Sequence, residues 1–164
     1  DLGFTRVSAW MSLAQSTEII GMFGIGWLLL KWRVKWIFAV GLAFGLTRFG
    51  LSTLNIPAGL LANIILHGGS FTLVFITAAI YLDQRVAAAW RTRAQALMAL
   101  MNNGVGNLVG YLGTGWWFSA CTHSAVTHWP VFWGGLAVLI GGVMVYFLTV
   151  YRTVGDGKLI KNTV

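Results

Sequence analysis

The 164-residue chain is apolar and basic: 57% of its residues are hydrophobic, 9% are charged, and the formal net charge at pH 7 is +7. The mean hydropathy of +0.76 lies outside the range of ordinary soluble domains and indicates an integral membrane protein. The basic residues separate apolar segments instead of clustering on a polar domain, so they do not indicate nucleic-acid binding. Cys121 is the only cysteine, which excludes an internal disulfide and leaves no Cys/His spacing for a metal.

Five apolar segments are each long enough to cross a hydrocarbon core of about 30 Å as a helix. They are 8–30, 36–54, 57–82, 94–118 and 131–151. We therefore predict an all-α fold, a polytopic membrane helical bundle with five transmembrane helices. The chain begins at Asp1 without Met and lacks the basic-then-apolar start of a signal peptide, so we interpret it as part of a longer protein.

Nine of the eleven Lys and Arg residues flank the segments on one side of the predicted membrane. They are Lys31, Arg33, Lys35, Arg85, Arg91, Arg93, Arg152, Lys158 and Lys161. The connections at 55–57 and 121–129, on the other side, contain no Lys or Arg. Because basic loops stay cytoplasmic, we predict a multi-pass protein of the inner (plasma) membrane, with the N-terminus of the chain outside and the C-terminus cytoplasmic.

Glu18 is the only carboxylate inside a predicted span, and it lies near the middle of segment 8–30. A charge there is costly, so such a residue usually faces a water-filled cavity or a partner. Gln15 is three residues away and shares its helix face. Glu18 is therefore a candidate for ligand binding and proton handling; the alternative is a protonated Glu18 that is hydrogen-bonded inside the bundle.

Arg48 lies inside the second segment, twelve residues from its predicted cytoplasmic end, as Glu18 does in the first. At about 1.5 Å per residue, both side chains should lie about 18 Å from the inner face. An ion pair between Glu18 and Arg48 would follow if the two helices are neighbours. The alternative is that Arg48 extends outward to water or binds backbone carbonyls elsewhere.

The third segment carries a polar stripe with Phe71 and Thr72 beside it, and Gly68-Gly69 thins the helix so that a neighbour or a ligand can approach. The stripe consists of Asn63, His67, Ser70 and Thr77. The fourth segment also has polar residues, and its Gly106 and Gly110 form a GxxxG pair that favours close helix packing. We expect the first, third and fourth segments to line a cavity, and the second and fifth to pack outside.

Six short motifs occur in an order that resembles one family of transporters. They are SLAQSTE at 12–18, LTRFG at 46–50, LHGGSF at 66–71, IYLD at 80–83, RAQAL at 93–97 and GVGNLVG at 104–110. In this order they resemble the nucleoside:proton symporters of the major facilitator superfamily. The resemblance implies that the chain is part of the C-terminal half, about helices eight to twelve, and lacks the N-terminal half.

The resemblance also implies a nucleoside site between two six-helix halves, alternating access, and coupling to protons. Gln15 and Glu18 match the polar pair that the family uses for substrate and proton, and His67 and Phe71 match its aromatic positions. Thr72 departs from the pattern, because better-known members carry Asp there. The loop 31–35 lacks the Asp and Gly of the usual cytoplasmic gate motif, so the gating salt bridges of that motif do not carry over.

We thus predict a secondary transporter whose substrate residues are Gln15, Glu18, His67, Phe71 and Thr72, with Glu18 and Arg48 in proton coupling. Its expected partners are a nucleoside, protons, the lipid bilayer and the missing N-terminal half, without nucleic acid. We find no catalytic constellation and predict no enzyme, metal or cofactor. The alternatives are a transporter of another small polar metabolite such as a sugar, and a non-transporting membrane scaffold subunit that is complete at five spans.

Overall fold

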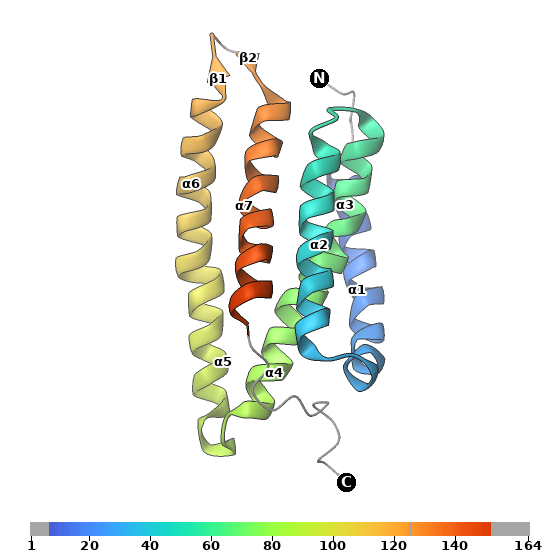
Figure 1. The fold of residues 1–164 in the computed structure, drawn as a ribbon, viewed down its shortest axis with the longest axis vertical. Helices are drawn as coiled ribbons and strands as arrows, with labels where there is room; N and C mark the ends of the chain where they lie inside the picture. Colours follow the sequence, from blue (N-terminus) through green and yellow to red (C-terminus); the bar gives the residue numbers. More distant parts are fainter. Residues whose placement is uncertain (1–6, 125, 152–164) are drawn as a thin grey trace.

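The computed structural model describes residues 7–124 and 126–151, which form five long helical stretches (Figure 1). These are α1 (Val7–Lys31); α2 (Val34–Ser52); α3 (Pro57–Phe71) continued by the π-helical η1 (Thr72–Ile76) and α4 (Thr77–Arg85); α5 (Arg91–Ala99) continued by the π-helical η3 (Leu100–Gly106) and α6 (Asn107–Ala120); and α7 (Trp129–Val150). A single 3-10 turn, η2 (Ala88–Trp90), precedes α5. The predicted helical bundle is confirmed.

Three of these stretches are long and apolar enough to cross a membrane by length and composition: Val34–Ser52, Pro57–Arg85 and Trp129–Val150. The other two predicted spans, 8–30 and 94–118, are helical over their whole length. Their insertion as spans stays a prediction.

A small hairpin is the one β structure among the described residues. Strands β1 (Thr122–His123) and β2 (Val126–Thr127) pair antiparallel, with Thr122 opposite Thr127. The two threonine hydroxyls lie 3.0 Å apart across the pair. The hairpin closes the end of the molecule opposite the basic loops and turns α6 back into α7 (Figure 1).

Helix α2 lies between α3 and α7 and not on the outside, which corrects the expectation for segment 36–54. Its small residues allow this position. A Cβ added at Gly41 would lie 2.8 Å from Val74 Cγ2, and one at Gly45 would lie 3.4 Å from Ser70 Oγ and 3.5 Å from Ile140 Cγ2. Helices in lipid associate through such close van der Waals packing.

A cluster of buried apolar residues lies at the basic end and joins α1 to α2. It contains Ile25, Leu29, Val34 and Ile37, and Ile37 is fully buried. Leu73 and Ile80, from the stretch that includes α3 and α4, pack against it. This cluster fixes the depth of α1 relative to α2 and α3.

Two expectations about the later segments need correction. Among the described residues, no helix packs on the GxxxG pair in 94–118, because a Cβ at Gly110 would meet no atom within 4 Å and one at Gly106 would meet only Met101 of its own helix. Helix α7, expected outside, packs one side on α2 and exposes apolar residues such as Val138 on the other.

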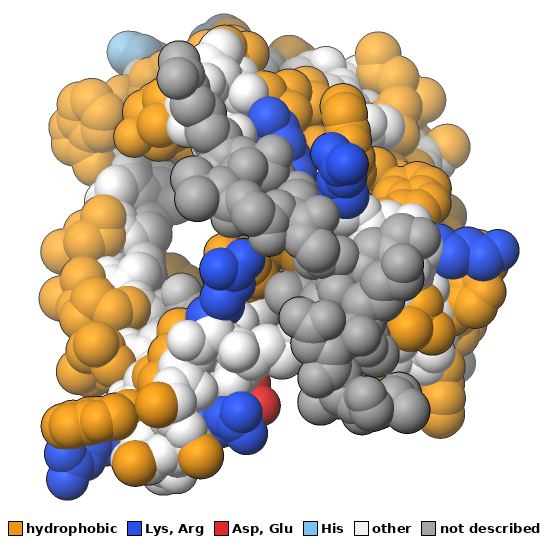
Figure 2. Space-filling view, turned by 60° about the horizontal axis from the view of Figure 1, so that its bottom comes forward, with side chains coloured by type: hydrophobic (Ala, Val, Ile, Leu, Met, Phe, Trp, Pro, Cys, Tyr) orange, Lys and Arg blue, Asp and Glu red, His pale blue; other side chains and the backbone are white. Residues whose placement is uncertain are grey.

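Apart from Arg48, the basic side chains of the described residues lie at one end, which faces the viewer in Figure 2, with Lys and Arg in blue. Lys35 Nζ donates hydrogen bonds to the carbonyls of Leu148 at 3.3 Å and Tyr151 at 3.0 Å. These carbonyls close the C-terminal end of α7, so Lys35 ties α2 to α7 and offsets the negative end of the helix dipole.

Candidate substrate and proton site

Helices α1 and α3 approach most closely at Gly68. A Cβ at this position would overlap Thr17 Oγ1 and the backbone nitrogen of Glu18. Thr17 Oγ1 donates to the Ile65 carbonyl at 3.0 Å and also lies 2.9 Å from the Ala14 carbonyl. The predicted close approach at Gly68-Gly69 is confirmed, and the neighbour at Gly68 is α1. The contact places Glu18 at the level of His67.

Thr72 lies one turn further along the same contact. Its side chain is fully buried, and its hydroxyl donates to the Glu18 carbonyl at 3.3 Å. A Cβ at Gly21 would lie 2.8 Å from Thr72 Oγ1. The predicted role of Thr72 as a substrate contact is not favoured by this geometry, because the side chain has no exposed surface to offer a ligand.

Arg48 contacts His67. A guanidinium N–H of Arg48 donates to Nδ1 of the imidazole. Because a guanidinium group has donors only, Nδ1 must accept, which describes a neutral His67 with its proton on Nε2. The guanidinium carbon also lies 4.4 Å from the ring centroid of Phe49. His67 is thereby fixed as a hydrogen-bond donor through Nε2.

Glu18 and Arg48 form no ion pair among the described residues. Arg48 contacts the imidazole of His67 instead of Glu18 or a backbone carbonyl. The physical reason is the order of the helices. The prediction assumed that α1 and α2, neighbours in sequence, pack side by side, whereas α3 lies between them and contacts both. It is therefore His67 on α3, and not Glu18 on α1, that contacts Arg48.

Other members of the predicted polar stripe hold α3 against α2 instead of lining a cavity. Asn63 Nδ2 donates to Ser52 Oγ at 2.8 Å, and Ser52 Oγ donates to the Arg48 carbonyl at 3.0 Å. Ser70 Oγ donates to the Gly41 carbonyl at 3.0 Å. Within the described residues, Thr77 Oγ1 is buried without a partner.

The remaining predicted residues lie on one open flank. Helices α1 and α3 run in the same direction (Figure 1), and their contact faces are centred on Thr17 and Gly68. At about 100° per residue, Gln15 and Glu18 then point to the same side of the helix pair as Phe71. Gln15 is exposed, and Glu18 and Phe71 are partly exposed.

An aromatic pair extends this flank along α3. The rings of Phe71 and Phe75 have centroids 5.0 Å apart, and Phe75 is 41% exposed. His67, also exposed, lies one turn before Phe71. The flank thus combines an amide, a carboxyl group, an imidazole donor and aromatic faces.

Sequence reasoning did not assign a role to Thr17, Gly21 or Ser52, which make the helix contacts behind this flank. A signal for the first two is present, since Ala14, Thr17 and Gly21 are small residues at helical spacing that complement Gly68. The π-helical segments η1 and η3 were also not predicted. Such segments often occur near functional sites.

Comparison with known sequences identifies the chain's relatives. It is 27% identical over 164 residues to the putative nucleoside transporter YegT of Escherichia coli K12. This alignment covers 93% of this chain and 39% of that protein. It is 26% identical over 157 residues to the xanthosine permease of the same organism, covering 93% of this chain and 38% of that protein. The chain therefore spans about two fifths of the length of these relatives.

The fold also matches solved structures. A crystal structure of the nucleoside transporter NupG superposes with a TM-score of 0.79 at 24% identity, over 89% of this chain and 38% of that one. A crystal structure of a NupG mutant gives a TM-score of 0.81 at 23% identity with the same coverage. The arrangement of α1 to α7 is thus a part of the NupG fold.

The sequence pattern of one family covers almost the whole chain. It is described as nucleoside H+ symporter and matches residues 3–156. Its members are multi-pass membrane transporters and not enzymes, in agreement with the predicted class. The chain belongs to the nucleoside H+ symporter family.

Proposed function

We propose that the chain is the C-terminal part of a plasma-membrane transporter that moves nucleosides together with protons by alternating access. The observation that carries the proposal is the family match over residues 3–156. Because the chain spans about two fifths of its relatives, transport is proposed for the complete protein, in which the missing N-terminal half would form the other wall of the cavity.

The open flank of α1 and α3 suits a nucleoside. The base offers an aromatic face to Phe71, whose neighbour Phe75 continues the stacking surface. Gln15 and Glu18 offer an amide and carboxyl oxygens to ribose hydroxyls, and His67 offers its Nε2 proton to an acceptor on the base. A few such polar groups set among aromatic side chains are typical of small-molecule sites.

Glu18 is the proposed proton carrier. It is the only acid in the described transmembrane helices apart from Asp83, which lies at the basic end and faces Arg91 at 4.0 Å. Since Arg48 is engaged by His67, no described cation fixes Glu18 in its charged form. A carboxyl group in such a place can exchange its proton as the cavity opens to one side and then to the other.

The proposed topology has five spans, with the basic end in the cytoplasm. It is supported by the common location of Lys31, Arg33, Lys35, Arg85 and Arg93 at the helix ends opposite the hairpin (Figure 1). In this proposed orientation, the hairpin faces the outside.

Uptake by the complete transporter tests the proposed function. Proteoliposomes with an imposed pH gradient, acidic outside, would be offered labelled nucleosides and labelled sugars. We expect nucleosides to accumulate above equilibrium and a protonophore to abolish the accumulation. Accumulation of sugars without nucleosides would instead support the alternative substrate class, and exchange without accumulation would contradict proton coupling.

A further inference from the structure

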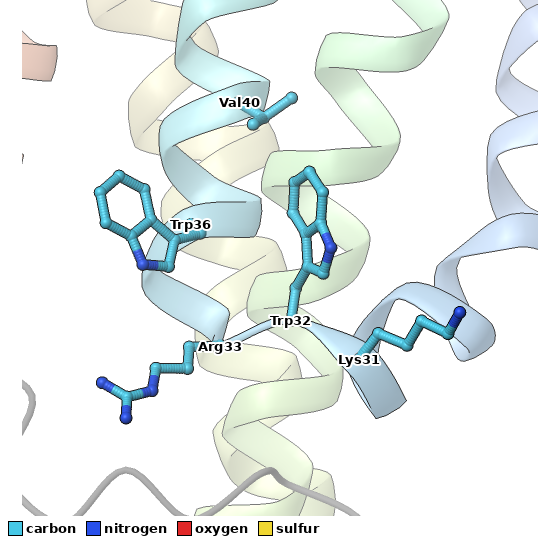
Figure 3. Close-up of a pocket in the computed structure, with 5 residues that line it drawn as sticks. All are labelled: Lys31, Trp32, Arg33, Trp36 and Val40. Atoms are coloured by element: carbon cyan, nitrogen blue, oxygen red, sulfur yellow. The ribbon is translucent and has the colours of Figure 1, made fainter.

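A cavity at the basic end lies outside the proposed substrate site. It has a volume of about 490 Å³ and is lined by Lys31, Trp32, Arg33, Trp36 and Val40 (Figure 3). These residues come from the last turn of α1, the two-residue connection and the first two turns of α2. The connection is held by the backbone, because Trp32 N donates to the Leu28 carbonyl at 2.8 Å and Trp36 N to the Arg33 carbonyl at 2.9 Å.

The cavity has an apolar part and a cationic rim. In Figure 3 the indole rings of Trp32 and Trp36 rise on the side of Val40, while Lys31 and Arg33 extend away in opposite directions. Both indoles are accessible, with Trp32 43% and Trp36 54% exposed. Tryptophan rings at a helix end are characteristic of the membrane interface.

The two cations of the rim have no acidic partner among the described residues. Of the acids described, Asp83 faces Arg91, and Glu18 lies thirteen residues before Lys31, about 20 Å along α1. Lys31 Nζ instead lies 4.4 Å from the ring centroid of Trp27. Lys35, by contrast, is held by carbonyls at the end of α7. Within the described part of the chain, the rim thus presents positive charge without an acidic partner beside apolar walls.

We propose that this cavity binds an anionic phospholipid. The phosphate group lies at the cationic rim, and the glycerol and upper acyl chain lie against Trp32, Trp36 and Val40. A cationic rim at the cytoplasmic end of a membrane helix attracts anionic headgroups. The apolar walls favour a lipid over a free phosphate ion, which would gain nothing from them.

Native mass spectrometry of the complete transporter in detergent tests the proposal with phosphatidylglycerol. The double variant Lys31→Gln/Arg33→Gln removes the rim. The control Arg85→Gln/Arg93→Gln removes the same charge from the same end, where these arginines stack on Tyr81 and Trp90 outside the cavity. We expect affinity to fall about tenfold in the first variant and to change less than about twofold in the control. Equal affinities in both would overturn the proposal.

Competition separates the two sources of a phosphate group. We expect phosphatidylcholine to bind about tenfold more weakly than phosphatidylglycerol, and inorganic phosphate not to displace the bound lipid. Displacement of the lipid by inorganic phosphate would overturn the lipid assignment in favour of a soluble anion.

Tryptophan fluorescence gives a readout that preserves the charges. Lipids with brominated acyl chains quench nearby indoles, and we expect brominated phosphatidylglycerol to quench more than brominated phosphatidylcholine. This excess should disappear in Trp32→Phe/Trp36→Phe and persist in Trp116→Phe/Trp129→Phe, whose indoles lie at the other end. An excess that persists in Trp32→Phe/Trp36→Phe would contradict a lipid in this cavity.

Discussion

Phe71 and His67 are the residues on α3 through which the proposed site would distinguish nucleosides from other solutes. Phe71→Ala in the complete transporter should weaken nucleoside binding about tenfold, because a stacked base loses its aromatic partner. Equilibrium binding of a labelled nucleoside measures this. The matched control is Phe23→Ala, which removes an 86% exposed ring on the far side of α1 and should leave binding unchanged. Equal affinities for both variants would remove Phe71 from the site.

His67 also has a structural role, which can be tested separately from ligand binding. His67→Phe leaves the guanidinium of Arg48 without its acceptor, and a typical hydrogen bond contributes about 0.5–1.5 kcal/mol to stability. The melting temperature in detergent should therefore fall by several degrees. His67→Gln supplies an amide oxygen to Arg48 and should restore most of the loss. If both variants melt like the wild type, the Arg48–His67 contact does not stabilise the fold.

At the scale of helices, the site depends on the close approach of α1 and α3. Gly68→Val forces bulk against Thr17 and the Glu18 backbone, where no space exists, and such overpacking typically costs about 1–3 kcal/mol or more. We expect a lower melting temperature and loss of uptake. Gly24→Val, where an added Cβ meets nothing within 4 Å, is the control. Wild-type stability of Gly68→Val would show that the helices separate freely.

The sequence predicts the helices better than their arrangement. Hydropathy located every helical stretch, and the Gly68-Gly69 pair correctly indicated a close neighbour, because both signals are local. The placement of α3 between α1 and α2 depends on which faces fit together, so the suggested Glu18–Arg48 pair failed and the Arg48–His67 contact was missed. The burial of Thr72 escaped prediction for the same reason, since its partner Gly21 lies on another helix.

At the scale of the whole molecule, topology can be tested at the two ends. Cys121 itself is a poor reporter, because its side chain is only 4% exposed. In a Cys121→Ala background, Val126→Cys in the hairpin should react with an impermeant thiol reagent on intact cells, since Val126 is 62% exposed. Ala88→Cys, between α4 and α5, should react only after permeabilisation. The reverse pattern would invert the proposed orientation.

We propose that Glu18 couples proton movement to nucleoside movement, and Glu18→Gln in the complete transporter is the sharpest test of this role. Glutamine keeps the size and much of the hydrogen bonding of the side chain but cannot titrate. We predict that nucleoside exchange across proteoliposomes survives, while accumulation driven by a pH gradient is lost between about pH 5 and about pH 8. Accumulation at the wild-type level over that range would contradict the proton role, and loss of exchange as well would assign Glu18 to substrate binding instead.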